Sequence, residues 1–251
     1  GLEEVLLMHQ KGLLTYALNL IGNLVYIDEV DTGQLCNCYC PSCKEKLVAK
    51  NGGMKRVHHF AHASGVDCEN AYETMLHQLA KLRVQEAFLS KEVFNVGFEY
   101  RSYCPHVKTC AFVRYGNCYI STHKRFNLKE FYDSCEQEIQ YDSINRRSDL
   151  KIFSSKKPQL APIYIEFFVT HASDVSKLHN GGKIIEVKIE SENDIQRIVD
   201  DGFIESSKCD SRLLEGIESE NISETTFWGF KSEDYDCLLY TSPSPRDISG
   251  S

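Results

Sequence analysis

The chain has 251 residues, of which 42% are hydrophobic and 25% charged, and its formal net charge is −8. This composition is typical of a globular protein and excludes a disordered or collagen-like chain. No apolar run approaches the ~18 residues that a membrane-spanning helix needs. The start of the chain lacks the features of a signal peptide, so we expect a cytoplasmic protein with no membrane association. It also lacks an initiator Met, which is expected of a fragment.

The negative charge is concentrated in the C-terminal part. Residues 185–240 carry 15 acidic and 5 basic side chains, a net charge of −10. Residues 1–184 carry 22 basic and 20 acidic side chains, a net charge of +2. The larger N-terminal part can therefore approach a polyanion such as DNA without strong repulsion. The acidic C-terminal part would suit a basic protein partner.

The chain has 11 cysteines, and several of them are clustered near histidines. The C-x-x-C pair of Cys40 and Cys43 precedes the run H-H-F-A-H at residues 58–62. A two-residue knuckle presents two thiolates, and histidines three apart face one way on a helical turn, so the spacing predicts tetrahedral zinc in a reducing compartment. The alternative, which involves no metal, is a set of reduced surface thiols with unrelated histidines. The candidate ligands are Cys36, Cys38, Cys40, Cys43, Cys68, His58, His59 and His62.

The N-terminal elements surround this cluster. Apolar runs at residues 13–20 and 24–30, separated by Gly22-Asn23, predict a β-hairpin. Short strands are predicted at residues 46–50 and 56–60. Helical apolar spacing then predicts a helix at residues 71–91. Glu73, His77 and Lys81 share one face of that helix, either as a solvated stripe or as part of a site.

The middle of the chain predicts strands at residues 94–103 and 111–120, a helix at residues 128–135 and a strand at residues 138–144. It also holds further cysteines. A second metal site would use Cys104, Cys110 and Cys118 with either His106 or Cys135. Their spacing is not that of a zinc knuckle, so buried thiols within a sheet are the favoured interpretation.

The segment from Arg146 to Ile189 carries the strongest signal. Runs rich in β-branched and aromatic residues predict strands at residues 150–153, 163–169 and 184–189, with a helix at residues 172–179 before the last. Asp149 starts the first strand, and Glu166 lies inside the second. A carboxylate in an apolar strand is costly unless it is paired or holds a cation, so this pair predicts a Mg²⁺ site. The alternative is that Glu166 pairs with Arg147 or Lys151.

Five motifs carry a resemblance to a known family: C-P-x-C, H-F-A-H, E-x-x-x-H, R-x-D-L and I-E-x-x-V-T-H. In this order, over roughly residues 16–198, they resemble the competence protein CoiA-like family of the PD-(D/E)xK nuclease superfamily. The resemblance implies an α+β or α/β fold, with a restriction-endonuclease-like core (α-β-β-β-α-β) and an N-terminal zinc-ribbon-like β lobe. The expected domains are a zinc-binding lobe at 1–70, a nuclease-like core at 71–200 with a Cys-containing insertion at 93–135, an acidic extension at 201–238, and a disordered or artefactual tail at 239–251.

The resemblance also implies the site residues. The zinc ligands would be Cys40, Cys43, His59 and His62, and the alternates would be Cys36, Cys38, His58 and Cys68. Asp149 and Glu166 would hold Mg²⁺, with Glu73 and His77 beside them. The superfamily's lysine, two residues after the glutamate, is Phe168 here. The preferred substitute is Lys177, followed by Lys151 and Lys81, and His171 would contact phosphate or cap a helix.

The expected function is therefore metal-dependent hydrolysis of phosphodiester bonds in DNA, in DNA uptake, DNA processing or mobile-element biology. Zn²⁺ would be structural and Mg²⁺ catalytic. Phe168 keeps two other classes open. One is an inactive nuclease fold that binds nucleic acid, and the other is a zinc-stapled protein-interaction domain.

Overall fold

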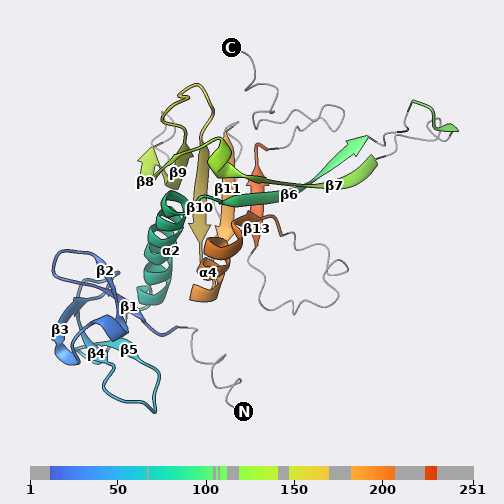
Figure 1. Cartoon of the computed structure of the whole chain (residues 1–251). Coiled ribbons are helices and arrows are strands. Elements are labelled where there is room, and N and C mark those ends of the chain that lie inside the picture. Colours follow the sequence, from blue (N-terminus) through green and yellow to red (C-terminus); the bar gives the residue numbers. More distant parts are fainter. Residues whose placement is uncertain are drawn as a thin grey trace. The chain divides into compact units, whose positions relative to one another are not determined.

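The computed structural model describes residues 12–66, 68–103, 106, 108–111, 119–140, 147–169, 182–206 and 224–230. Within them the protein is a mixed α+β fold with three sheets and two α-helices (Figure 1). Neither described helix is both long and apolar enough to span a bilayer. The chain divides into two compact units, residues 1–83 with 189–195 and residues 84–188 with 196–251. Each unit is described by itself.

The first unit is built on a five-stranded sheet. Its order is β2-β1-β3-β4-β5, and the pairs between its strands are antiparallel. An isolated bridge between Leu14 and Phe60 joins β5 back to the segment before β1. The lobe therefore closes on a small apolar core. The strands are β1 (Tyr16–Leu18), β2 (Leu24–Tyr26), β3 (Gly33–Tyr39), β4 (Lys46–Lys50) and β5 (His59–His62).

The predicted N-terminal hairpin is present as β1 and β2. The Asn19 side chain accepts hydrogen bonds from the backbone N–H groups of Ile21 (3.1 Å) and Asn23 (2.9 Å), which fixes the turn. Gly22 has a φ of 86°, a conformation that glycine adopts without the steric cost that other residues meet. The first half of α2 (Ala71–Ser90) also belongs to this unit, where the Met75 sulfur accepts from the Tyr16 N–H at 3.4 Å.

The second unit contains the other two sheets. The larger has the order β13-β11-β10-β9-β8, in which β8, β9 and β10 form an antiparallel meander and β10 runs parallel to β11. The smaller has the order β12-β6-β7. A parallel neighbour requires a crossover connection, and the segment predicted as a helix at residues 172–179 lies outside the described residues. The strands are β6 (Asn95–Tyr103), β7 (Tyr119–Asn127), β8 (Ser134–Gln140), β9 (Arg147–Phe153), β10 (Ile163–Phe168), β11 (Lys183–Lys188), β12 (Phe203–Ile204) and β13 (Thr225–Trp228).

The two faces of the larger sheet differ in character. Register and period-two alternation place alternate residues of β9, β10 and β11 on one apolar face. Aromatic rings extend this core, with Phe98 lying 5.2 Å from Phe227 and 5.7 Å from Phe230 between ring centroids. The opposite face carries the charged residues considered below. The buried apolar residues of the first face include Leu150, Ile152, Ile163, Ile165, Ile185 and Val187.

One predicted helix is wrong. The helix expected at residues 128–135 is a single 3₁₀ turn, η3 (Leu128–Glu130), and strand β8 already begins at Ser134. The Asn127 side chain accepts from the Lys129 N–H (3.1 Å) and from the Phe94 N–H (2.9 Å), so the turn is capped locally. The segment then pairs with β9, where Cys135 faces Ile152. Tertiary pairing has overridden a weak helical preference.

Helix α4 (Glu192–Asp201) begins directly after Ser191. The Asp194 carboxylate accepts from the N–H groups of Glu190 (2.8 Å) and Ser191 (3.3 Å), which satisfies donors at the start of the helix. The chain leaves the helix through Gly202, whose φ is 83°. A Cβ there would lie 1.8 Å from the Asn95 carbonyl oxygen, so only glycine fits.

Lys183 is a buried cation on the apolar face. It pairs with Ile163, is 3% exposed, and its Nζ has no hydrogen-bond partner among the described residues. Burial lowers the pKa of Lys183 to about 8. We expect Lys183→Met to stabilise the second unit at pH 7 by roughly 2 kcal/mol, because it removes the cost of a buried charge. Urea unfolding measures this, with the exposed Lys157→Met as control.

The same group predicts a pH dependence. Its folded pKa of about 8 lies below the ordinary lysine value of 10.5, so between these pH values the unfolded chain binds more protons than the folded one. The contribution of Lys183 to stability therefore rises with pH across that window, and the full penalty applies below it. Lys183→Met should lack this rise. Destabilisation by Lys183→Met at pH 7 would show instead that the amine is paired.

Candidate functional site

Four potential metal ligands converge in the first unit. Cys40, Cys43, His62 and Cys68 each offer one ligand atom, and these atoms all lie within 4.8 Å of one another. Among the described residues, no other group of three or more Cys, His, Asp or Glu side chains comes together this closely. Cys40 and His62 are buried and Cys43 is exposed, so the cluster lies at the edge of the lobe.

The distances within this Cys₃His cluster fit tetrahedral zinc. Zn–S bonds of about 2.3 Å at tetrahedral angles place two sulfurs about 3.8 Å apart, and a sulfur and a nitrogen about 3.6 Å apart. The sulfurs of Cys40 and Cys68 are 3.7 Å apart, and the Cys43 sulfur is 3.3 Å from Nε2 of His62. Three thiolates with one imidazole are also a donor set that structural zinc sites use. The cluster can therefore hold a metal such as zinc.

The local backbone positions these ligands. Cys40 follows β3, and its carbonyl accepts from the Lys44 N–H (3.1 Å), which closes a tight turn around Cys43. Lys44 has a φ of 65°, the left-handed conformation that lets the turn reverse. His62 ends β5, opposite Leu47 of β4. Cys68 arrives from the loop before α2, so the cluster ties two strand ends to the start of the helix.

The predicted fourth ligand, His59, is not part of this cluster. The prediction of His59 depended on a helical turn, on which histidines three residues apart share a face. H-F-A-H is instead strand β5, so His59 and His62 point to opposite faces. The Nδ1 atom of His59 lies 2.9 Å from the Val57 carbonyl oxygen. Cys68, one of the alternate ligands, is the fourth member of the cluster in place of His59.

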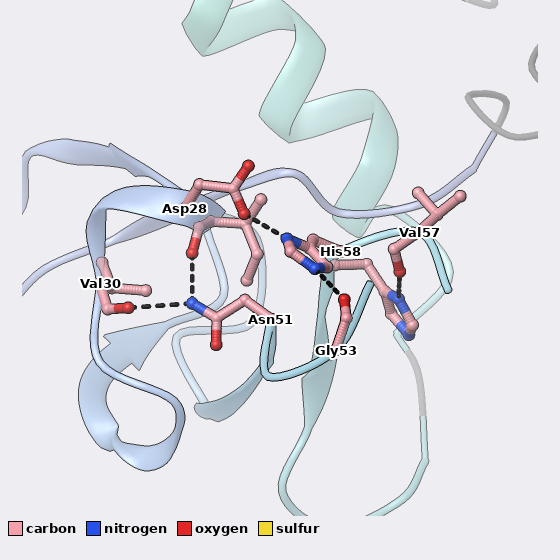
Figure 2. Close-up of polar contacts among 8 residues, drawn as sticks. Asp28, Val30, Asn51, Gly53, Val57 and His58 are labelled. Carbon is pink, nitrogen blue, oxygen red and sulfur yellow. Dashed lines mark hydrogen bonds and ion pairs between the residues drawn. The ribbon is translucent and has the colours of Figure 1, made fainter. Parts of the chain in front are cut away.

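His58, another alternate, is engaged elsewhere (Figure 2). Its Nδ1 contacts the Asp28 carboxylate, and its Nε2 lies 2.6 Å from the Gly53 carbonyl oxygen. Both neighbours are acceptors, and only a protonated imidazole offers two donors. The Gly53 carbonyl and the Asp28 carboxylate accordingly raise the pKa of His58 above its ordinary value. Beside it, Asn51 donates to the carbonyls of Ile27 (2.7 Å) and Val30 (2.9 Å). This network holds the loop in place, and His58 is not part of the metal cluster.

Protonation of the thiols matters for metal uptake. Burial raises the pKa of Cys40 to about 11, so in the absence of a metal this thiol keeps its proton at neutral pH. A metal would displace that proton, because thiolate is the form that binds zinc.

The remaining described cysteines do not join a metal group. Cys38 is buried, and burial raises its pKa to about 12. The Cys36 sulfur contacts the Leu47 carbonyl at 3.5 Å. In the second unit Cys135 is buried in β8, and burial raises its pKa to about 12. The proposed second site rests on Cys104 and Cys118, which lie outside the described residues, with Cys110.

The two predicted carboxylates are neighbours in the second unit. Residues 163, 164 and 165 of β10 pair with 152, 151 and 150 of β9, so Glu166 falls opposite Asp149 one step further on. At that step the Asp149 side chain itself accepts from the Phe167 N–H at 2.7 Å. Where the β9–β10 ladder ends, the Asp149 carboxylate is therefore the hydrogen-bond acceptor in place of a backbone carbonyl of β9. Asp149 and Glu166 therefore lie side by side at the point where β9 and β10 separate.

The other predicted site residues lie in the first unit, outside the described residues, or away from Asp149. Glu73, His77 and Lys81 lie on α2 in the first unit, whereas Asp149 and Glu166 belong to the second, so their proximity stays a prediction. Lys177 and His171 lie outside the described residues. The Nζ atom of Lys151 is 5.1 Å from the centroid of the Phe153 ring, on the side away from Asp149 along β9.

Comparison with known proteins gives a match only in the N-terminal lobe. Residues 27–71 match the family model described as Competence protein CoiA, N-terminal domain. The matched segment contains all four residues of the Cys₃His cluster. No curated protein and no solved structure matched the chain. The match supports the CoiA-like resemblance but does not reach Asp149 or Glu166.

Proposed function

We propose that this chain is a metal-dependent nuclease-like protein that hydrolyses phosphodiester bonds in DNA. The observation that carries the proposal is that Asp149 and Glu166 each lie one residue beyond the last β9–β10 register pair, on adjacent strands. Support comes from the sheet around them. An antiparallel meander β8-β9-β10 followed by a parallel β11 agrees with the restriction-endonuclease-like core that the resemblance implies. The carboxylates lie on β9 and β10, two adjacent strands that both have neighbours on either side.

The donor set suits Mg²⁺. Mg²⁺ keeps several waters and is commonly held by one or two carboxylates, so a pair is sufficient. One oxygen of Asp149 accepts a hydrogen bond from the Phe167 N–H, which fixes the orientation of the carboxylate. When bound, the metal would supply an activated water and offset charge at the phosphorus. The chain's own contribution is to hold both carboxylates rigidly on neighbouring strands.

The N-terminal lobe suits a docking or structural role. Its match to the N-terminal domain of a competence protein supports a role in DNA uptake or processing. The basic residues Lys44, Lys46 and Lys50 lie in and beside β4, close in sequence to the metal cluster. Such residues attract phosphate without reading base sequence.

Phe168 favours a second function, a catalytically inactive module that binds nucleic acid. Phenylalanine can neither polarise water nor neutralise a phosphate, and it stands where the superfamily has lysine. If no other cation reaches the site, the fold would retain binding and lose cleavage.

The experiment that tests the proposal is cleavage of labelled single- and double-stranded DNA by the purified protein with Mg²⁺ or Mn²⁺. We expect Asp149→Asn to abolish cleavage, because it removes a charged metal ligand while an amide oxygen can still accept from the Phe167 N–H. The control is Glu136→Gln, an exposed residue of β8. Equal cleavage by wild type and Asp149→Asn would contradict the proposal. DNA binding without cleavage by any variant would support the inactive module.

A further inference from the structure

One face of the first sheet is accessible to solvent and carries basic side chains. The inward residues of β4 and β5, which include Leu47, Ala49 and Phe60, are buried, whereas the residues that alternate with them are half-buried or exposed. Side chains alternate along a strand, and residues paired across neighbouring strands point to the same side. The outer face therefore holds Tyr39 of β3, Lys46, Val48 and Lys50 of β4, and His59 and Ala61 of β5.

The charge on this part of the chain is mostly positive. Residues 39–62 carry five basic side chains and one acidic side chain, in a chain whose net charge is −8. Lys46 and Lys50 are exposed, and so are Lys55 and Arg56 in the loop between β4 and β5. Within the described part of the chain, none of these four side chains makes a hydrogen bond or an ion pair. Cations without internal partners attract a polyanion.

The loop between β4 and β5 is held at both ends (Figure 2). At its start, the Asn51 side chain donates to two backbone carbonyls. At its end, His58 contacts the Asp28 carboxylate and the Gly53 carbonyl oxygen. The contact with His58 also offsets the charge of Asp28, an acidic residue beside the loop. The two basic residues of the loop are therefore presented on a preorganised segment, which reduces the conformational entropy that binding would cost.

The apolar and aromatic residues between the cations favour a single strand over a duplex. Val48 and Ala61 are register partners and lie side by side at the middle of β4. Tyr39 is the register partner of Lys46. Lys46 and Lys50 are about 13 Å apart along the strand. A single strand offers phosphates to the lysines and unstacked bases to the tyrosine ring, whereas a duplex keeps its bases stacked inside and would use only the lysines.

We propose that the outer face of β3, β4 and β5 binds single-stranded DNA, with Lys46 and Lys50 contacting phosphates and Tyr39 stacking on a base. Lys55 and Arg56 extend the basic surface at one end of β4. Phosphate contacts and stacking carry little sequence information, so the binding tolerates many sequences. The choice of DNA as the strand rests on the proposed function, whereas the surface itself belongs to the first unit and the proposed cleavage site to the second.

The test measures binding of the zinc-loaded full chain to a fluorescently labelled single-stranded oligonucleotide by anisotropy, without added Mg²⁺. Each phosphate contact made by a single strand steepens the fall of the logarithm of the binding constant with the logarithm of salt concentration by about 0.7. Lys46→Gln and Lys50→Gln should each weaken binding and reduce this slope by about 0.7. Tyr39→Ala should weaken binding about fivefold or more with an unchanged slope, and Tyr39→Phe should keep the affinity because it keeps the ring.

Lys157→Gln, which removes an exposed lysine of the second unit, is the matched control and should change neither affinity nor slope. Zinc content and circular dichroism establish that each variant is folded. Unchanged affinity in Lys46→Gln and Lys50→Gln, or no binding by the wild type, would overturn the proposed surface. Equal affinity for a duplex or for polyglutamate would show that the face binds any polyanion, and would overturn the choice of a single strand.

Failure of this inference and failure of the proposed function give different results. Binding that depends on Lys46 and Tyr39, in a protein that cleaves no DNA, supports the surface and contradicts the nuclease. Cleavage that requires Asp149, with single-strand affinity unchanged by Lys46→Gln, supports the nuclease and overturns the surface.

Discussion

Removal of the metal from the Cys₃His cluster should unfold the N-terminal lobe. The lobe has strands of three to seven residues and a small buried core that includes Leu14, Ile27, Leu47 and Phe60. So small a core contributes little net stability, and domains of this kind usually depend on a metal or disulfides. Structural zinc in finger peptides contributes about 10–16 kcal/mol of apparent binding free energy, which is more than such a lobe could lose and remain folded.

The measurement is circular dichroism and amide hydrogen exchange before and after chelation, together with metal analysis of the purified protein. We expect one zinc per chain at this cluster. Cys40→Ser and Cys68→Ser should each lower zinc content and expose the amides of β3, β4 and β5. His59→Ala should leave zinc bound, because His59 points to the opposite face of β5 from His62. Cys36→Ser is the control, since its sulfur contacts the Leu47 carbonyl outside the cluster. A lobe that keeps its exchange protection after exhaustive chelation would contradict this prediction.

The sequence predicts elements well where periodicity is strong. The strand at residues 46–50 is present with those bounds, and α2 ends one residue before the predicted end. The meander around Asp149 and Glu166 also follows the expected order. The helix predicted at residues 128–135 failed, because one side chain, Asn127, caps a single turn and the rest pairs with β9. Strand β3 (Gly33–Tyr39) was not predicted, and neither were β12 and β13. The last two are two and four residues long and are defined by the strands they join.

The same distinction applies to the site residues: local spacing predicts some of them, and the tertiary fold determines the others. Cys40, Cys43 and His62 could be identified from local spacing. The position of His59 depended on whether H-F-A-H forms a helix or a strand, which spacing alone does not decide. Cys68 is 25 residues after Cys43, and its approach is set by the closure of the lobe.

The missing superfamily lysine can be tested by restoring it at Phe168. Under the proposed function, Phe168→Lys should raise the cleavage rate, by up to about a hundredfold, because a lysine there supplies the transition-state cation that phenylalanine cannot. Phe168 is half-buried at the end of its strand, so a lysine there can keep its charged end in water or at the phosphate.

The readout is the single-turnover cleavage rate at saturating Mg²⁺, so that changes in metal affinity do not contribute. Phe153→Lys is the matched control, because it adds a lysine to the same face at the far end of β9. It should leave the rate unchanged. An equal gain in Phe153→Lys would show a general effect of positive charge. An unchanged rate in a folded Phe168→Lys variant would contradict a role for a cation at this position.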